Sequence, residues 1–328
     1  MLRLSLVLTL WLFSTVIYPT PLVIKFNHVV AQDTPKGKAA LKFKELAEKY
    51  TDGAVVVEVY PNSQLFKDRE ELEALQMGVI HMAAPSVSKF GPMGIRDFEI
   101  FDLPYLFPDV ETVHKVTDGK IGARLFKKIE KKGLRGLAFW DNGFKHFSAN
   151  KPLRKLKDFQ GLKMRIQSSK VLEATMRRLR TMPQVMAFSE VYTALQQGVV
   201  DGTENPISNL YTQKMHEVQK HLTLSHHGYL VYAVVTNKEF WDNLDPTIRH
   251  KLERAIVDVT AYERDIARAE NMAALEAVRK SGKTEIYELP SEEKEFWRER
   301  LLPVHKKFAE KIGKENLNDV YELLSNIQ

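Results

Sequence analysis

The sequence predicts an α/β protein whose two domains are joined by crossing strands. Apolar runs of strand length alternate with segments of helical periodicity, which is typical of a mainly parallel sheet with crossover helices. The chain has 328 residues and a hydrophobic content of 44%, enough for a packed core and most naturally for two domains. After Pro246 a helical pattern continues to about Lys280 without Gly or Pro, so this helix is long enough to run across both domains.

The first predicted elements are a strand, a helix and a second strand. Residues 22–29 form a largely apolar run that ends in Asn27 and His28, and residues 55–60 are rich in β-branched side chains, as strands are. Between them a helix is predicted that ends at Gly53. Its apolar face consists of Ala39, Phe43, Leu46, Ala47 and Tyr50.

A second helix and a third strand follow. Asp68 and Glu71 resemble a capping box at the start of a helix over residues 69–77, and Gly78 ends it. Residues 79–84 are predicted to form the next strand.

The same alternation continues to the C-terminus. A helix is expected over residues 170–180, Ser189 is expected to cap another over 190–197, and two helices close the chain. No internal repeat and no low-complexity linker is evident, so several strands rather than one flexible tether are expected to join the domains. The remaining strands are predicted at 134–140, 144–149, 162–166, 185–188, 229–236 and 285–289.

Composition limits the classes of function. There is no cysteine, which excludes disulfides, thiolate metal sites and cysteine nucleophiles. The net charge is +6 and the pI is about 9.1, but basic residues are interleaved with acids, as in residues 124–132. Aromatic residues do not alternate with them as a stacking platform for nucleic acid requires. Solvated helix faces, and no nucleic-acid partner, are therefore expected.

The N-terminus has the pattern of a signal peptide. Arg3 precedes an uncharged apolar stretch, residues 4–17, which is too short for a comfortable membrane span. No A-x-A cleavage site follows, and an uncleaved anchor is the alternative. We expect residues 1–20 to direct secretion into the periplasm and then to be removed.

Arg165 is the most informative single residue. It lies inside a short apolar run, residues 162–166, that reads as a buried strand, and burying a guanidinium without a partner is costly. Its planar fork suits a carboxylate bound through two hydrogen bonds. Arg165 is therefore either half of an internal ion pair or the clamp for an acidic ligand.

Other polar residues offer binding rather than catalysis. His28 follows the first strand and would face the crevice of an open sheet. The alternative is a surface or core histidine whose hydrogen bonds are all made within the protein. Residues 201–206 describe a sharp turn in which Asn205 offers a donor and an acceptor, or serves only to stabilise the turn. No nucleophile is paired with a base, His226 and His227 lack zinc-ligand spacing, and no glycine-rich phosphate loop occurs. We therefore expect no enzyme activity, no cofactor and no metal.

Six stretches, in order, resemble the solute-binding proteins of tripartite ATP-independent periplasmic (TRAP) transporters. The resemblance covers the chain from about residue 23 to residue 321. The stretches are YPNSQL (60–65), FDLPYLF (101–107), SANKPL (148–153), GLKMR (161–165), MAFSEVY (186–192) and LQQGVVDGTENP (195–206).

The resemblance implies a clamp of the periplasmic-binding-protein type that closes on an organic acid and delivers it to membrane permease subunits. Domain I would comprise residues 21–142 and 231–270, and domain II residues 143–230 and 271–328. A monomer is expected. The resemblance also implies that Arg165 pairs with the ligand carboxylate, that Asn205 contacts the ligand and that Phe188 lines the cleft. It further places Lys145 at the position of a basic residue of the family's ligand site, His28 at its first-strand position and Ser86 at that of a small residue after the third strand.

The subgroup is predicted from three further runs, residues 27–38, 140–145 and 164–170, which look like those of the four-carbon dicarboxylate binders. Sialic-acid binders carry an acidic residue near 84–86 and arginine in place of Lys145, and both are absent. Succinate, malate or fumarate is therefore expected, with another organic acid such as a 2-keto acid or sugar acid as the alternative.

A dicarboxylate needs two cationic or donor-rich ends. Arg165 is expected to hold one carboxylate, and Lys145 with His28 and Ser86 the other. Asn205 and Asn209 are expected to fix the orientation through neutral hydrogen bonds.

Overall fold

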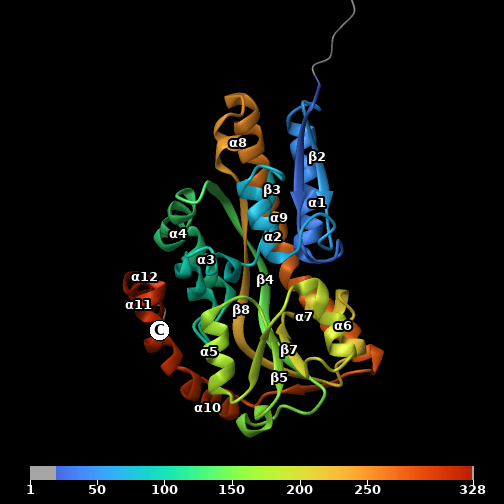
Figure 1. Cartoon of the computed structure of the whole chain (residues 1–328), viewed down its shortest axis with the longest axis vertical. Helices are drawn as coiled ribbons and strands as arrows, with labels where there is room; N and C mark the ends of the chain where they lie inside the picture. The colour runs from blue at the N-terminus through green and yellow to red at the C-terminus, as the bar shows by residue number, and fades with distance from the viewer. Residues whose placement is uncertain (1–19, 327–328) are drawn as a thin grey trace, which may run out of the picture.

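The computed structural model describes residues 20–326, so the predicted signal peptide lies outside the described residues except for its last position. Within this range no helix is both long and apolar enough to cross a membrane. The strands form one mixed sheet, and helices cover its faces (Figure 1). The strand order is β2-β1-β3-β8-β4-β7-β5-β6, and β9 pairs with β8.

The elements have the following bounds. The strands are β1 (Leu22–Asn27), β2 (Val55–Tyr60), β3 (Met82–Ala83), β4 (Leu134–Ala149), β5 (Lys163–Ile166), β6 (Met182–Val185), β7 (Gly202–Asn205), β8 (His221–Asn237) and β9 (Glu285–Glu288). The α-helices are α1 (Pro35–Tyr50), α2 (Asp68–Gln76), α3 (Val110–Asp118), α4 (Lys120–Glu130), α5 (Lys170–Arg178), α6 (Val191–Gln196), α7 (Ile207–Thr212), α8 (Lys238–Asp242), α9 (Pro246–Ser281), α10 (Ser291–Leu301), α11 (Pro303–Ile312) and α12 (Lys314–Ser325). Short 3₁₀ helices include η1 (Val87–Phe90) and η2 (Arg96–Asp102).

Two long antiparallel strands cross the whole molecule. β4 and β8 are paired from Leu134–Asn237 at one end to Ala149–His221 at the other. In Figure 1 they run down the middle, from the part that contains α1 and β2 to the part that contains α5, β5 and β7. The expectation that strands rather than a tether link the two parts agrees with this arrangement.

The long helix α9 also connects both parts. Asp245 caps its N-terminus by accepting hydrogen bonds from the amides of Thr247 and Ile248, and Gly282, with φ of 64°, ends it in the left-handed conformation. Its first half packs Leu252 and Val259 into the apolar core with α1 and β1. Its second half packs Ala274 and Val278 into a separate core with α6 and α7.

Each part contains the same β-α-β-α-β unit. In the first unit β1 pairs in parallel with β2 and β3, and in the second β5 pairs in parallel with β6 and β7. The segments that lead into β3 and β7 share the pattern A-L-Q-x-G-V, at residues 74–79 and 194–199. Gly78 and Gly198 take left-handed φ angles of 71° and 69°. The expectation of no internal repeat is therefore wrong, because the repeat lies in the topology and leaves only this short trace in the sequence.

Several element predictions are wrong in detail. Residues 134–149 form one strand, since a bulge at Asn142 bends β4 without ending it. Residues 202–205 are strand β7 rather than part of a sharp turn. Lys67, not Asp68, is the N-cap of α2, and Ser189 does not cap α6. Three helices rather than two close the chain, and β3 is only Met82–Ala83.

The predicted division into domains stays a prediction. It assigns residues 271–328 to domain II, and Trp297 of α10 does pack with Phe147 and Phe159 of that part. By contrast, Phe308 and Ile312 of α11 share a core with Phe98 of η2 in domain I. The C-terminal helices therefore pack across the predicted boundary.

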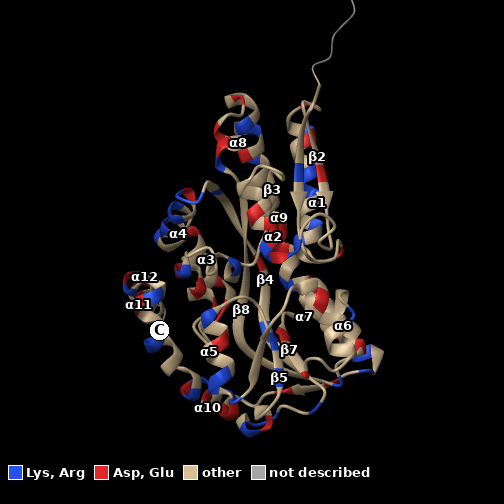
Figure 2. Cartoon of the chain, viewed as in Figure 1, with Lys and Arg blue, Asp and Glu red and all other residues tan. Residues whose placement is uncertain are grey.

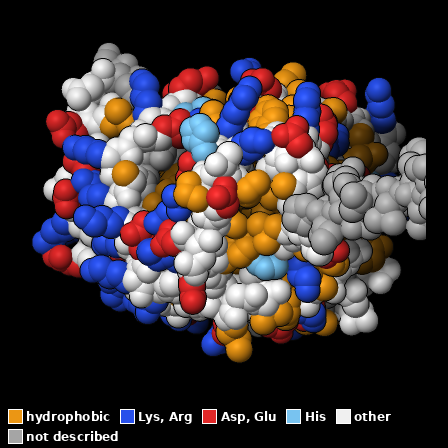
Figure 3. Space-filling model, turned by 90° about the horizontal axis from the view of Figure 1, so that it is seen from above, with side chains coloured by type: hydrophobic (Ala, Val, Ile, Leu, Met, Phe, Trp, Pro, Cys, Tyr) orange, Lys and Arg blue, Asp and Glu red, His pale blue; other side chains and the backbone are white. Residues whose placement is uncertain are grey.

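Positive and negative side chains are mixed over the surface. Figure 2 shows Lys and Arg next to Asp and Glu on most helices. In Figure 3, which views the end of the molecule at the top of Figure 1, basic side chains gather on the left with acidic ones among them. This mixture is what solvated helix faces produce, and it matches the interleaved charges of the sequence.

Candidate functional site

The predicted site residues are all buried. β1 and β5 are the middle strands of the two β-α-β-α-β units, and their carboxyl ends carry Asn27 and Arg165. Ligands bind at such strand ends in open α/β sheets. The exposed fractions are 0% for His28, 5% for Ser86, 1% for Lys145 and Arg165, 6% for Phe188, 4% for Asn205 and 2% for Asn209.

Arg165 has no carboxylate partner. Its Nε and Nη2 donate to the carbonyl oxygen of Met186 at 3.1 and 2.9 Å, and its guanidinium lies 5.6 Å from the ring centre of Phe188. Among the described residues no Asp or Glu oxygen lies within 4.0 Å of it, so it is not half of an internal ion pair. Burial lowers the pKa of Arg165, although the charges of Asp68 and Glu204 act in the opposite direction.

The position of Arg165 has a counterpart in the first unit. Asn27 lies at the end of β1, where this strand pairs with β3. Arg165 lies at the equivalent position of β5, where that strand pairs with β7. Asn27 Nδ2 donates to the carbonyl oxygen of Phe66 at 3.2 Å, just as Arg165 donates to Met186. The two units thus present equivalent positions to the space between them.

Lys145 is engaged by acidic side chains of the protein. Its Nζ lies 3.1 Å from Glu204 Oε2 and 3.5 Å from Asp102 Oδ1. His227 Nε2 lies 3.5 Å from the same Glu204 oxygen. Burial acts to lower the pKa of Lys145, but Glu204 and Asp102 outweigh it and raise that pKa. Its charge is therefore already balanced inside the protein.

Lys36 is a buried cation that the sequence analysis missed. It is 1% exposed, its Nζ donates to the carbonyl oxygen of Ala84 at 2.9 Å, and it lies 3.6 Å from the ring centre of Tyr232. Burial lowers its pKa to about 8. A signal was present, because Lys36 is three and four residues before Ala39 and Ala40, on the apolar face of the helix.

Tyr232 is surrounded by amide groups. Asn142 Nδ2 donates to its hydroxyl oxygen at 2.6 Å and Asn209 Nδ2 at 3.3 Å. Burial raises the pKa of Tyr232, so the hydroxyl keeps its proton. Two donors already face its oxygen, so that proton is directed toward another acceptor, and the Asn209 Oδ1 atom has no partner among the described residues.

The remaining predicted residues differ in whether their polar groups have hydrogen-bond partners. Both ring nitrogens of His28 lack a partner within the described chain, and burial followed by the charge of Lys36 lowers its pKa to about 3, so the ring is neutral. Ser86 Oγ donates to Ser88 Oγ at 3.3 Å, and Asn205 Nδ2 donates to Thr203 Oγ1 at 3.2 Å. The Phe188 amide donates to Asp68, which is also paired with Lys89 at 2.7 Å.

The two units touch along a seam beside these residues. Lys67 Nζ lies 2.9 Å from Glu190 Oε1, and the Lys170 amide lies 3.3 Å from Glu99 Oε1. With the contact between Asp68 and Phe188, they join the first unit and η2 to α5 and α6. Over residues 20–326 no group of three or more His, Asp or Glu side chains is placed to hold a metal ion.

Comparison with known proteins gives consistent matches. Residues 26–312 match the family model described as bacterial extracellular solute-binding protein, family 7. The chain is 64% identical to the C4-dicarboxylate-binding periplasmic protein DctP of Rhodobacter capsulatus, over 90% of this chain and 89% of that protein.

Solved structures match as closely in fold. A TRAP periplasmic solute-binding protein from Shewanella oneidensis with bound succinate superposes with a TM-score of 0.90, at 40% identity, over 92% of this chain and 98% of that one. The sugar acid binding protein DctPAm of Advenella mimigardefordensis, in complex with galactonate, gives a TM-score of 0.91 at 32% identity, over 94% of this chain and 99% of that one. The predicted α/β clamp architecture is thereby confirmed.

Proposed function

The chain belongs to family 7 of the bacterial extracellular solute-binding proteins, and from this premise we propose that it captures a C4-dicarboxylate for a TRAP transporter. Succinate, malate and fumarate are the candidate ligands. The protein binds without chemical turnover and delivers the acid to membrane permease subunits. Residues 1–20 would direct it to the periplasm, where a monomer would act.

One observation about buried charge supports a dianionic ligand. The buried lysine and arginine side chains of the described chain are Lys36, Lys89, Lys145 and Arg165. Lys89 and Lys145 each have a carboxylate within 4.0 Å, whereas Lys36 and Arg165 have none. Buried charges without a counter-ion are costly, so two cations without a carboxylate partner favour a ligand that brings two carboxylates.

We therefore assign the two ends of the ligand to the two units. Arg165 of the second unit holds one carboxylate through its guanidinium, and Lys36 of the first unit holds the other, with His28 beside it. Asn205, Asn209 and Tyr232 supply neutral hydrogen bonds. Ser86 and Phe188 line the same space.

This assignment moves Lys145 out of direct contact with the ligand. Because its charge is balanced by Glu204 and Asp102, its role is to keep Glu204 beside Asn205 in place. Removing it would leave two buried carboxylates unpaired, which is costly for the fold.

A sugar acid is the second candidate. The buried Asn209 Oδ1 and the two ring nitrogens of His28 lack partners among the described residues, and hydroxyl groups of a sugar acid would satisfy them. Such a ligand has only one carboxylate, however, and would leave Lys36 or Arg165 uncompensated.

Calorimetry with a small panel of acids tests the proposal. Wild-type protein, unfolded and refolded to remove any copurified ligand, is titrated with succinate, L-malate, fumarate and galactonate. We expect the dicarboxylates to bind much more tightly than galactonate. Tighter binding of galactonate would replace the dicarboxylate with a sugar acid, and no binding by any of the four would contradict the proposed function.

Ligand binding is expected to close the molecule. The seam contacts of Lys67 with Glu190 and of Asp68 with Phe188 can form only when the two units approach, with bending near residues 142–147 of β4 and 229–236 of β8. Small-angle scattering should show a smaller radius of gyration with saturating succinate than without it. Arg165→Ala protein at the same succinate concentration should keep the larger radius. An unchanged wild-type radius at saturation would contradict closure.

A further inference from the structure

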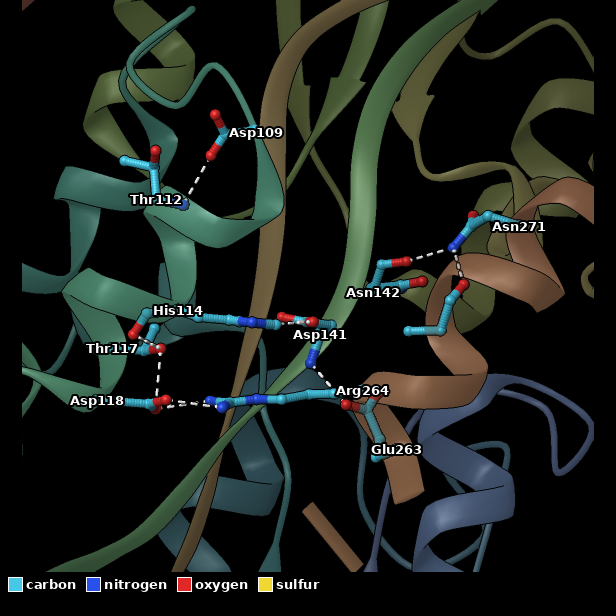
Figure 4. Close-up of polar contacts among 11 residues, drawn as sticks. Asp109, Thr112, His114, Thr117, Asp118, Asp141, Asn142, Glu263, Arg264 and Asn271 are labelled. Atoms are coloured by element: carbon cyan, nitrogen blue, oxygen red, sulfur yellow. Dashed lines mark hydrogen bonds and ion pairs between the residues drawn. The ribbon is translucent and has the colours of Figure 1, made fainter. Parts of the chain in front are cut away.

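A bulge in β4 lies between the proposed ligand site and the long helix α9. Asp141 pairs with Val231 and Gly143 with Leu230, so Asn142 is an extra residue without a partner on β8. Its backbone carbonyl is therefore free of the sheet ladder and needs another donor. Figure 4 shows Asn271 of α9 pointing at Asn142 from the side of the helix.

The Asn271 side chain binds three backbone groups. Its Nδ2 donates to the carbonyl oxygens of Asn142 at 2.5 Å and Ala267 at 2.8 Å, and its Oδ1 accepts from the Ser208 amide at 3.0 Å. Ser208 lies in the first turn of α7. The N-cap of this helix is Pro206, whose side chain cannot accept a hydrogen bond from the free amide groups of that turn. One amide group of α9 thus holds both the bulge of β4 and the start of α7.

The backbone conformation of Gly143 at the bulge leaves room for the contact with Asn271. Gly143 has φ of 131°, which L side chains rarely adopt, and a Cβ there would lie 2.9 Å from Asn271 Nδ2. Glycine is therefore required for two separate reasons, conformation and the close approach of Asn271.

The contact continues into the proposed ligand site. The side chain of Asn142 is 1% exposed, accepts from Ser208 Oγ at 2.9 Å and donates to the Tyr232 hydroxyl at 2.6 Å. The residue after Ser208 is Asn209, which also donates to Tyr232. Asn271 therefore reaches Tyr232 by two routes, through Asn142 and through α7.

We propose that Asn271 is a positioning residue for ligand binding, which acts on Tyr232 and Asn209 through Asn142 and Ser208 and makes no contact with the ligand. Through this chain the long helix fixes the hinge bulge and the Tyr232 hydroxyl in one arrangement. The inference rests on the proposed dicarboxylate binding. It adds a residue of α9 that ligand contacts alone would not identify.

The decisive variant is Asn271→Asp. It keeps the size of the side chain and the acceptor for Ser208 but replaces the two donated hydrogen bonds by an oxygen facing two carbonyl oxygens. We expect succinate to bind about tenfold more weakly, mainly through faster dissociation, because a displaced Tyr232 hydroxyl would lose its one hydrogen bond to the ligand. The same two hydrogen bonds are made without ligand, so the melting temperature of the ligand-free protein should also fall, and the loss of affinity must come in addition to this change. Calorimetry, stopped-flow fluorescence and thermal unfolding measure these quantities.

Two further variants make the test specific. Arg268→Ala, in the same helix and with no hydrogen bond or ion pair among the described residues, should bind succinate as wild type does. Ser208→Ala removes only the bond to Asn142 Oδ1 and should weaken binding severalfold, which keeps the proposal testable if Asn271→Asp does not fold. Combining Asn271→Asp with Tyr232→Phe should cost less than the product of the single losses, because both act on one hydroxyl.

Three results would overturn the inference. The first is unchanged succinate dissociation in both Asn271→Asp and Ser208→Ala. The second is a lower melting temperature of the ligand-free variants with unchanged affinity, which would show a purely structural role. The third is fully multiplicative losses in the double variant. Failure of wild-type protein to bind any dicarboxylate would instead contradict the proposed function on which the inference rests.

Discussion

Replacing Arg165 with alanine is expected to weaken succinate binding by about a hundredfold or more, because removing one partner of a buried charge pair typically costs about 2–5 kcal/mol. The guanidinium is 1% exposed and is held in place by two hydrogen bonds to the Met186 carbonyl oxygen. It is thus oriented before a ligand arrives, so little conformational entropy is lost when a carboxylate binds. Isothermal titration calorimetry measures the effect directly.

Arg165→Lys is expected to fail almost as completely. An ammonium group keeps the charge, but it cannot donate to Met186 and to both oxygens of a carboxylate in the fixed geometry of a guanidinium. Arg177→Ala, an exposed arginine on α5, serves as the control and should bind normally. Binding of succinate by Arg165→Ala within threefold of wild type would show that Arg165 is not the clamp.

Features with a local sequence pattern were predicted well. The helical periodicity after Pro246 gave α9 almost to the residue, because a helix of this length repeats its signal many times. The arginine in the strand at 162–166 was singled out because a charge in an apolar run is anomalous on its own. Neither prediction required knowledge of distant parts of the chain.

Features that depend on distant partners were not predicted. The choice between a free and a paired cation needs the positions of Glu204 and Asp102, which are far from Lys145 in sequence. Lys36 stands among other lysines of α1 that remain partly exposed, and although its place on the apolar face is a local signal, its contact with Tyr232 depends on a distant strand. The sequence predicts a break between strands where β4 has its bulge at Asn142, since Gly143 carries the same local signal in both cases.

The charge at the second end of the ligand gives the other large effect that we expect. Lys36→Met should remove most of the preference for succinate over butyrate, because the two acids are equal in length and differ by one carboxylate. A charged hydrogen bond contributes about 1.5–3 kcal/mol, so the loss for succinate should be about ten- to a hundredfold, with little change for butyrate. The experiment titrates wild type and the variant with both acids.

Lys145→Met is the matched comparison, since it removes a second buried lysine of the same region. It should leave Glu204 and Asp102 without their cation and so lower the melting temperature of the ligand-free protein, by the destabilisation typical of a broken buried pair, about 3–5 kcal/mol. Lys36→Met breaks no ion pair and should melt close to wild type. If instead Lys145→Met removes the succinate preference and Lys36→Met keeps it, Lys145 holds the second carboxylate after all.

The dependence of binding on pH provides an independent check on Lys36. Burial in this arrangement of the two units lowers the pKa of Lys36 to about 8, so its charge is present at pH 7 and is largely lost by pH 9. A cation that must be charged to bind a carboxylate makes affinity fall as pH rises through its pKa, so wild-type binding of succinate should weaken over this range. Burial also raises the pKa of Glu71 to about 8, and its ionisation disfavours a dianion in the same direction. The diagnostic quantity is therefore the difference between proteins: the slope should be clearly smaller in Lys36→Met than in wild type, and equal slopes would place the second carboxylate away from Lys36.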